Sequence, residues 1–138
     1  LGAAAGIARD RLRDDMQNMK FLRDHLQRLL FDALEGIVLN GHPLERLPNT
    51  LNISIPGIEG AAVLEGIPRI YASTGAACHD REVRLSHVLS AMGVRPEVGM
   101  GTLRLSLGRS NTLEQIEEAA NMIIDRVKEI RGSGHSRP

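Results

Sequence analysis

Cysteine, lysine and aromatic residues are all scarce in this chain of 138 residues. The single cysteine, Cys78, excludes an internal disulfide framework and a multi-cysteine zinc site, and it fits a reducing compartment such as the cytoplasm. With two Phe, one Tyr and no Trp, the chain has no set of rings on which nucleic-acid bases could stack. Basic and acidic residues number 17 each, so no net field favours nucleic acid or acidic lipid, and no apolar run reaches the length of a membrane span.

The two ends of the chain differ in character. The first six residues include no initiator Met and resemble no signal peptide, so we interpret Leu1 as a cut end that another segment precedes in the native protein. Residues 132–138 are typical of a flexible tail. We therefore predict one domain over residues 1–131 and a tail over 132–138.

Hydrophobic spacing predicts an α+β domain. Apolar residues at helical intervals indicate one helix over about 2–35 and another that Thr112 and Gln115 open as a capping box. Alternating apolar and polar residues indicate strands, and shorter runs indicate two further helices. The predicted strands cover residues 51–55, 70–72 and 102–107, and the short helices cover 59–66 and 85–92. The order predicts a two-layer sandwich in which the long terminal helices cover one face of a sheet.

Cys78 is the first candidate for chemistry. A lone cysteine is more often a small apolar residue than a nucleophile. Small residues precede Cys78, and His79, Asp80 and Arg81 follow it, which predicts a loosely packed polar loop over 73–84. A neighbouring His79 or Arg81 would lower the pKa of the thiol and provide a thiolate. An incidental exposed cysteine remains the alternative.

Arg104 is the second candidate. It alternates with leucines in the last predicted strand, so its side chain should face away from the apolar side. A guanidinium in that position either binds both oxygens of a carboxylate or forms an ordinary surface ion pair. Arg109 has the same ambiguity, and its place just before a helix favours a structural role.

Metal and phosphate sites find little support. His79, Asp80 and His87 lie close to Cys78, but one thiol without regular ligand spacing does not predict a metal site. Neither common glycine-rich phosphate loop occurs, because Gly99-Met100-Gly101 precedes a strand and not a helix.

Four stretches in order resemble the cysteine desulfurases, a family of aminotransferase-like enzymes that depend on pyridoxal phosphate. They are residues 48–54 (Pro-Asn-Thr-Leu-Asn-Ile-Ser), 73–78 (Ser-Thr-Gly-Ala-Ala-Cys), 85–93 (Leu-Ser-His-Val-Leu-Ser-Ala-Met-Gly) and 102–109 (Thr-Leu-Arg-Leu-Ser-Leu-Gly-Arg). The start of the last helix, residues 112–116, is also similar. Each motif alone is weak, whereas the ordered set covers almost the whole chain and indicates the carboxyl-terminal domain of such an enzyme, with the fold-type I architecture.

The resemblance implies a function for both candidates. Cys78 stands where the family's loop cysteine takes the sulfur of L-cysteine as a persulfide, leaves L-alanine and passes the sulfur to an acceptor protein, for example in iron–sulfur cluster assembly. Arg104 stands where the substrate carboxylate binds. The family's cofactor lysine follows a histidine, and neither Lys20 nor Lys128 does. We therefore expect pyridoxal phosphate only in a longer homodimeric protein, none on this chain alone, and the cofactor-binding residues in the missing amino-terminal part.

Two alternatives stay open. Ala-Ala-Cys-His at residues 76–79 is similar to the loop of selenocysteine lyases, which would act on selenocysteine, whereas residues 85–93 favour the desulfurases. The chain could also be a persulfide carrier or adaptor that never meets the cofactor.

Overall fold

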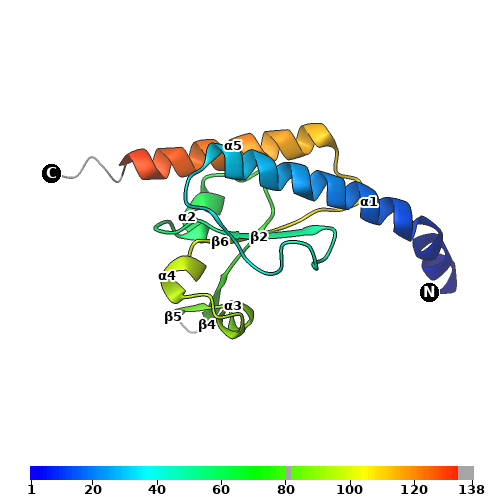
Figure 1. The fold of residues 1–138 in the computed structure, drawn as a ribbon, viewed down its shortest axis with the longest axis horizontal. Coiled ribbons are helices and arrows are strands. Elements are labelled where there is room, and N and C mark those ends of the chain that lie inside the picture. The colour runs from blue at the N-terminus through cyan, green and yellow to red at the C-terminus, as the bar shows by residue number, and fades with distance from the viewer. Residues whose placement is uncertain (80–81, 134–138) are drawn as a thin grey trace.

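A computed structural model describes residues 1–79 and 82–133 of the chain, with only the backbone described over 76–79 and 82–84. Two long helices lie at the ends of this part of the sequence, and short strands and helices lie between them (Figure 1). The helices are α1 (Gly2–Ala33), α2 (Gly60–Glu65), α3 (His87–Ala91), α4 (Pro96–Gly99) and α5 (Leu113–Ser133). The strands are β1 (Val38–Leu39), β2 (Thr50–Ser54), β3 (Ser73–Thr74), β4 (Ala76–His79), β5 (Glu82–Leu85) and β6 (Thr102–Ser106).

Four of the strands form an antiparallel sheet in the order β1-β2-β6-β3. β2 and β6 pair along their whole length, with Leu51 opposite Leu105 and Ile53 opposite Leu103. Directly opposed residues in an antiparallel pair point to the same face, so these four side chains share one side of the sheet. The α+β class predicted from the sequence is confirmed in this form, a mixed domain around a four-stranded antiparallel sheet.

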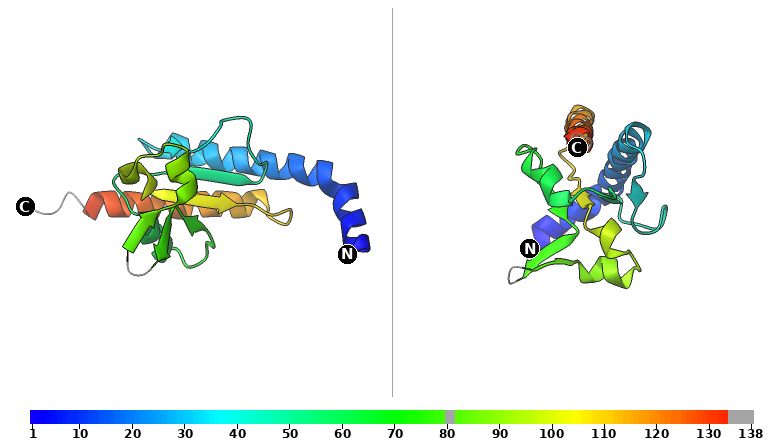
Figure 2. Two further views of the ribbon diagram at one scale, coloured as in Figure 1. Left: turned by 90° about the horizontal axis from the view of Figure 1, so that it is seen from below. Right: turned by 90° about the vertical axis from the view of Figure 1, so that its left-hand side faces the viewer.

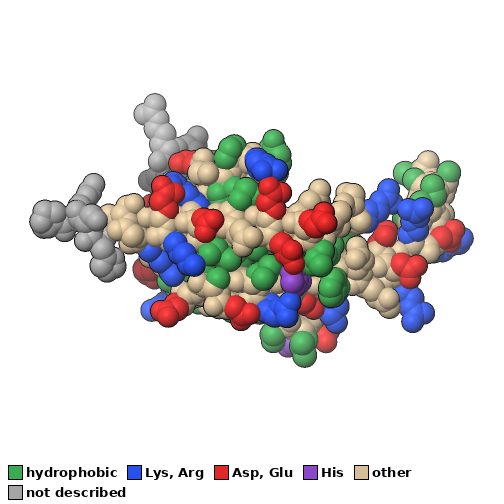
Figure 3. Space-filling view, turned by 90° about the horizontal axis from the view of Figure 1, so that it is seen from above, with side chains coloured by type: hydrophobic (Ala, Val, Ile, Leu, Met, Phe, Trp, Pro, Cys, Tyr) green, Lys and Arg blue, Asp and Glu red, His purple; other side chains and the backbone are tan. Residues whose placement is uncertain are grey.

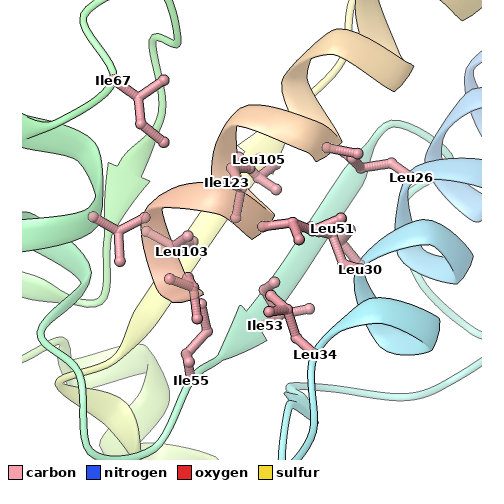
Figure 4. Packing of buried hydrophobic residues seen from close by; sticks show 14 of the residues in the cluster. Leu26, Leu30, Leu34, Leu51, Ile53, Ile55, Ile67, Leu103, Leu105 and Ile123 are labelled. Atoms are coloured by element: carbon pink, nitrogen blue, oxygen red, sulfur yellow. The ribbon is translucent and has the colours of Figure 1, made fainter. Parts of the chain in front are cut away.

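The hydrophobic core lies between that apolar face and the two terminal helices, which run side by side over the sheet (Figure 1). Leu30 of α1 and Ile123 of α5 are fully buried and project toward Leu51 and Leu103 (Figure 4). A buried leucine of this kind typically contributes about 2–5 kcal/mol to stability, judged by its replacement with alanine. The core thus fixes the sheet against α1 and α5.

Local signals define where the long helices end. At the start of α5, the Gln115 amide N–H donates to Thr112 Oγ1 at 3.3 Å, and the Thr112 amide N–H donates to Gln115 Oε1 at 3.2 Å. This reciprocal pair confirms the capping box. α1 ends at Ala33, near the predicted limit, and Gly36 follows with a positive φ of 73°. The first half of α1 extends beyond the core (Figure 2).

Three local predictions were wrong. Residues 70–72 form no strand, because the Ile70 amide bonds Ile67 O in a turn and the chain joins the sheet only at Ser73. The loop predicted over 73–84 contains β3 and a β4–β5 hairpin. The helix predicted from residue 85 begins at His87, because Leu85 belongs to β5 and Ser86 Oγ caps the helix by accepting from the Val88 amide at 3.3 Å.

The short helix α4 was not predicted, because four residues are too few to show a helical period. At the carboxyl end, α5 continues through Gly132 and Ser133, two residues into the predicted tail. The remainder of that tail, residues 134–138, lies outside the described residues.

The outer surface of the two long helices is of mixed polarity. The face made by α1 and α5 carries acidic and basic side chains intermixed with apolar ones (Figure 3). Across the described residues, no helix is both long enough and apolar enough to span a membrane.

Candidate functional site

The second face of the sheet carries polar side chains. Arg104 in the centre of β6 pairs with Asn52 of β2 on one side and with Ser73 of β3 on the other. These three residues, here called the polar row, therefore project from the face opposite the leucines. The alternation Leu103, Arg104, Leu105 has one exposed side chain between two buried ones, which confirms the predicted orientation of Arg104.

The Arg104 guanidinium is held at the surface by a neutral partner. Its Nη2 donates to Ser73 Oγ at 3.1 Å. Arg104 is exposed, and it forms no ion pair with a carboxylate in the part of the chain that the structure describes. Such a guanidinium keeps donors available for a planar anion such as a carboxylate.

An open hollow of about 380 Å³ adjoins Arg104. Its walls combine the guanidinium with two hydroxyl side chains, an exposed phenol and small or apolar groups. They are formed by Leu64, Ile70, Tyr71, Ala72, Ser73, Arg104 and Ser106. Sequence reasoning missed Ser73 and Tyr71, because the strand was predicted three residues too early. The hollow thus combines one cationic and several hydroxyl groups with an apolar side.

A buried polar network supports one end of the polar face. Ser54 Oγ and Thr102 Oγ1 lie 2.7 Å apart, and both residues are fully buried. Asn40 Nδ2 donates to Ser54 Oγ at 2.8 Å and to Asn52 Oδ1 at 2.9 Å. Sequence reasoning missed this network, although the polar positions that alternate with Leu51 and Ile53 signalled where it lies. Fully paired buried groups of this kind fix the strands in one register.

The hairpin that carries Cys78 is attached directly beside this network. The Gly75 amide donates to Thr102 O at 3.1 Å, and the Ser86 amide donates to Gly75 O at 2.7 Å. A Cβ on Gly75 would lie 2.4 Å from Thr102 Cβ, so only glycine allows the two segments to pack this closely. The base of the hairpin is therefore fixed between β3 and α3.

Cys78 lies on β4 opposite Val83 of β5. Its side chain, and those of His79, Asp80 and Arg81 that we expected to lower the pKa of its thiol, lie outside the described residues. His87 is exposed at the start of α3. Among the described residues, no three His, Cys, Asp or Glu side chains gather in a way that could hold a metal ion. Arg109 is exposed in the connection to α5.

The two lysines lie away from the polar row. Lys20 is exposed on α1 and Lys128 is exposed on α5, and both helices pack on the apolar side of the sheet. Pyridoxal phosphate is held through a lysine Schiff base, and neither lysine lies on the face of the sheet that carries the polar row. The described residues of this chain therefore do not fit the cofactor by themselves.

Comparisons with known proteins relate the whole chain to one family. It is 36% identical to the cysteine desulfurase IscS of Methanosarcina thermophila, over 100% of this chain and 34% of the relative. It is 38% identical to cysteine desulfurase 2 of Trichormus variabilis, over 95% of this chain and 33% of the relative. No protein-family profile matches it.

Solved structures agree with the sequence relatives. A NifS-like protein from Rickettsia africae superposes with a TM-score of 0.79 at 28% identity, over 92% of this chain and 33% of that structure. A second NifS-like protein gives a TM-score of 0.75 at 31% identity, over 88% of this chain. The fold is thus that of one part of a NifS-like protein. The chain is homologous to the cysteine desulfurases and spans about a third of their length, consistent with the carboxyl-terminal domain that its motifs indicated.

Proposed function

We propose that this chain is the small carboxyl-terminal domain of a cysteine desulfurase with fold-type I architecture, a two-layer sandwich over residues 1–131 followed by a tail. The complete protein would convert L-cysteine to L-alanine and deliver the sulfur to an acceptor protein, as in iron–sulfur cluster assembly. It would act as a cytoplasmic homodimer with pyridoxal phosphate held by residues outside this chain.

Cys78 accepts the sulfur in this proposal. Its thiolate attacks the sulfur of the bound substrate, so an S–S bond forms at Cys78 Sγ while the carbon–sulfur bond of the substrate breaks. The electron pair of the broken bond stays with the carbon that becomes the methyl group of alanine. The bound cofactor supplies the electron sink that makes this cleavage accessible.

Arg104 binds the α-carboxylate of the substrate, and this residue carries the proposal. Its guanidinium is exposed on the polar face, bonded to Ser73 and adjoining an open hollow that is large enough to admit a small amino acid. Only four residues separate Ser73 from Cys78, so β3, whose Ser73 hydroxyl bonds Arg104, leads directly into the hairpin that carries Cys78.

The test uses the full-length protein that contains this chain. We expect alanine release from cysteine and a persulfide on Cys78 that mass spectrometry detects. Cys78→Ala should abolish both without changing cofactor absorbance. Arg104→Gln should raise KM for cysteine about tenfold or more, since it removes a charge-assisted bidentate contact. Arg95→Gln, an exposed arginine at the start of α4, is the matched control and should leave KM unchanged.

Two outcomes would favour the alternatives. A clear preference for selenocysteine under equal conditions would indicate a selenocysteine lyase. A native protein no longer than these 138 residues would indicate a persulfide carrier or adaptor. The purified chain alone, mixed with pyridoxal phosphate, should show no absorbance band of protein-bound cofactor, and such a band would contradict our assignment of the cofactor lysine to another segment.

A further inference from the structure

Asn52 lies next to Arg104 on the polar face, and the proposed function gives its side chain no role. The two residues are directly opposed in the β2–β6 ladder. Their Cβ atoms are therefore neighbours, at the distance of about 4.5–5.5 Å that is usual for such pairs. An amide and a guanidinium at this separation can bond the same small anion.

The orientation of the Asn52 amide is fixed from the β1 side of the sheet. Asn40 is 8% exposed, and its Nδ2 donates both to Asn52 Oδ1 at 2.9 Å and to Ser54 Oγ at 2.8 Å. The backbone amide of Asn40 also donates to Asn52 O at 2.9 Å. Because the acceptor oxygen of Asn52 is bound to Asn40, its Nδ2 is directed away from that contact. Among the side chains and backbone groups that the structure describes, Asn52 Nδ2 donates to none.

The polar row thus has donors on two adjacent side chains and no anion of its own. Arg104 donates to the neutral Ser73 hydroxyl, whereas Arg23, Arg46, Arg69 and Arg126 each lie within 4 Å of a carboxylate. Unused N–H groups beside an unpaired guanidinium are the arrangement that binds a carboxylate with good geometry.

We propose that Asn52 is a second binding residue for the α-carboxylate of the substrate, with Nδ2 donating to one oxygen while Arg104 binds the other. Asn40 acts as its positioning residue. This inference rests on the proposed function, since it assumes that Arg104 binds the substrate carboxylate. It adds a residue to the site and a reason for the buried asparagine beneath it.

Asn52→Asp separates this role from a purely structural one. An aspartate keeps an oxygen that can accept from Asn40, so the network with Ser54 is preserved. It loses both N–H donors but also places a charge beside Arg104, which that guanidinium can bind, so Asn52→Ala, which removes the donors without adding a charge, is measured with it. Asn121→Asp makes the same chemical change at an exposed position of α5, on the far side of the sheet, and is the matched control.

The experiment measures KM and kcat for L-cysteine in the full-length protein, together with inhibition by cysteamine, which lacks the carboxylate. Asn52→Asp and the uncharged Asn52→Ala should both raise KM for L-cysteine, the former about tenfold or more, while changing kcat less and leaving cysteamine inhibition as in the wild type. Asn121→Asp should change none of these quantities. The comparison of the two ligands holds even if the variant is less stable, because lost active protein affects both equally.

Three results would overturn the inference in different ways. A KM for Asn52→Ala equal to that of Asn121→Asp, in an active enzyme, would leave Asn52 as a structural residue only, because the effect of Asn52→Asp would then come from its charge beside Arg104. Equal weakening of cysteine and cysteamine would exclude a specific carboxylate contact. A wild-type protein that releases no alanine from cysteine would refute the proposed function itself, and the role of Asn52 with it.

Discussion

Gly75→Ala tests how the Cys78 hairpin is attached to the sheet. The added Cβ would lie 2.4 Å from Thr102 Cβ, 2.7 Å from Leu89 Cδ1 and 2.8 Å from Gly99 O. The Leu89 methyl can rotate away, but Thr102 Cβ and Gly99 O belong to or adjoin the backbone and cannot. Overpacking of this kind costs about 1–3 kcal/mol, and two rigid contacts place this site at the upper end of that range.

A smaller opposing effect must be subtracted. Gly75 does not have a positive φ, so alanine can adopt its backbone conformation and restricts the unfolded chain, a gain of about 0.4–1 kcal/mol. The net expectation is a loss of about 2 kcal/mol. For a domain of this size the midpoint of urea unfolding, followed by circular dichroism, should fall by about 1 M, with an unchanged slope.

The matched control is Gly6→Ala in α1, where an added Cβ meets nothing within 4 Å. This change should not destabilise the chain, because alanine is the better helix former by about 1 kcal/mol. If Gly75→Ala unfolded at the same urea concentration as Gly6→Ala, our account of the close packing would be refuted. If the hairpin instead moved away to relieve the clash, the Ser86 amide, which donates to Gly75 O, would exchange its proton faster.

Two further predictions concern charge and the core. Burial, and after it the nearby charge of Arg23, lowers the pKa of Arg46. The charged form of Arg46 therefore reduces the free energy of unfolding at neutral pH. This reduction becomes smaller as pH rises through the folded-state pKa. Arg46 also leaves Nε and Nη1 buried without a partner among the described residues, so Arg46→Met should raise the free energy of unfolding by about 1 kcal/mol in urea titrations at pH 7. Leu30→Ala should lower the free energy of unfolding by about 3 kcal/mol, because Leu30 is fully buried. Leu44 is 80% exposed, so Leu44→Ala should leave that free energy within about 0.5 kcal/mol of the unsubstituted value. Equal effects of the two changes would contradict the burial described for α1.

The apolar face was predictable from the sequence and much of the polar face was not. Alternation with polar residues identifies the inward positions, because a strand that buries one face places an apolar residue at every second position. These positions are Leu51, Ile53, Leu103 and Leu105. The same alternation places Arg104 on the opposite side. What no local pattern encodes is which polar residues meet across strands, because Arg104 and Ser73 are 31 positions apart in the chain. Their pairing depends on a turn at residues 67–70 that delays the entry of β3.

The short segments around Cys78 were hard to predict for a different reason. Small residues before a charged run are typical of a loop, and residues 73–77 meet that description. They form strands because Gly75 has no side chain, so Thr102 and Gly99 can approach its backbone closely. The absence of bulk that indicated loose packing in the sequence is thus what permits close packing in the fold. Only the three-dimensional contacts show whether such small residues form a loose loop or pack closely.

One face of the sheet forms the core of this domain, and the other face carries its exposed polar side chains. Helices α1 and α5 bury the leucine face and supply the core, so the opposite face is free to keep exposed donors that a core would not tolerate. The buried Asn40, Ser54 and Thr102 network holds the strands of that polar face in register and adjoins the glycine from which the Cys78 hairpin extends. A change in this network should therefore alter the polar row and the base of the hairpin together. A change on the exposed surface of α5 should alter neither.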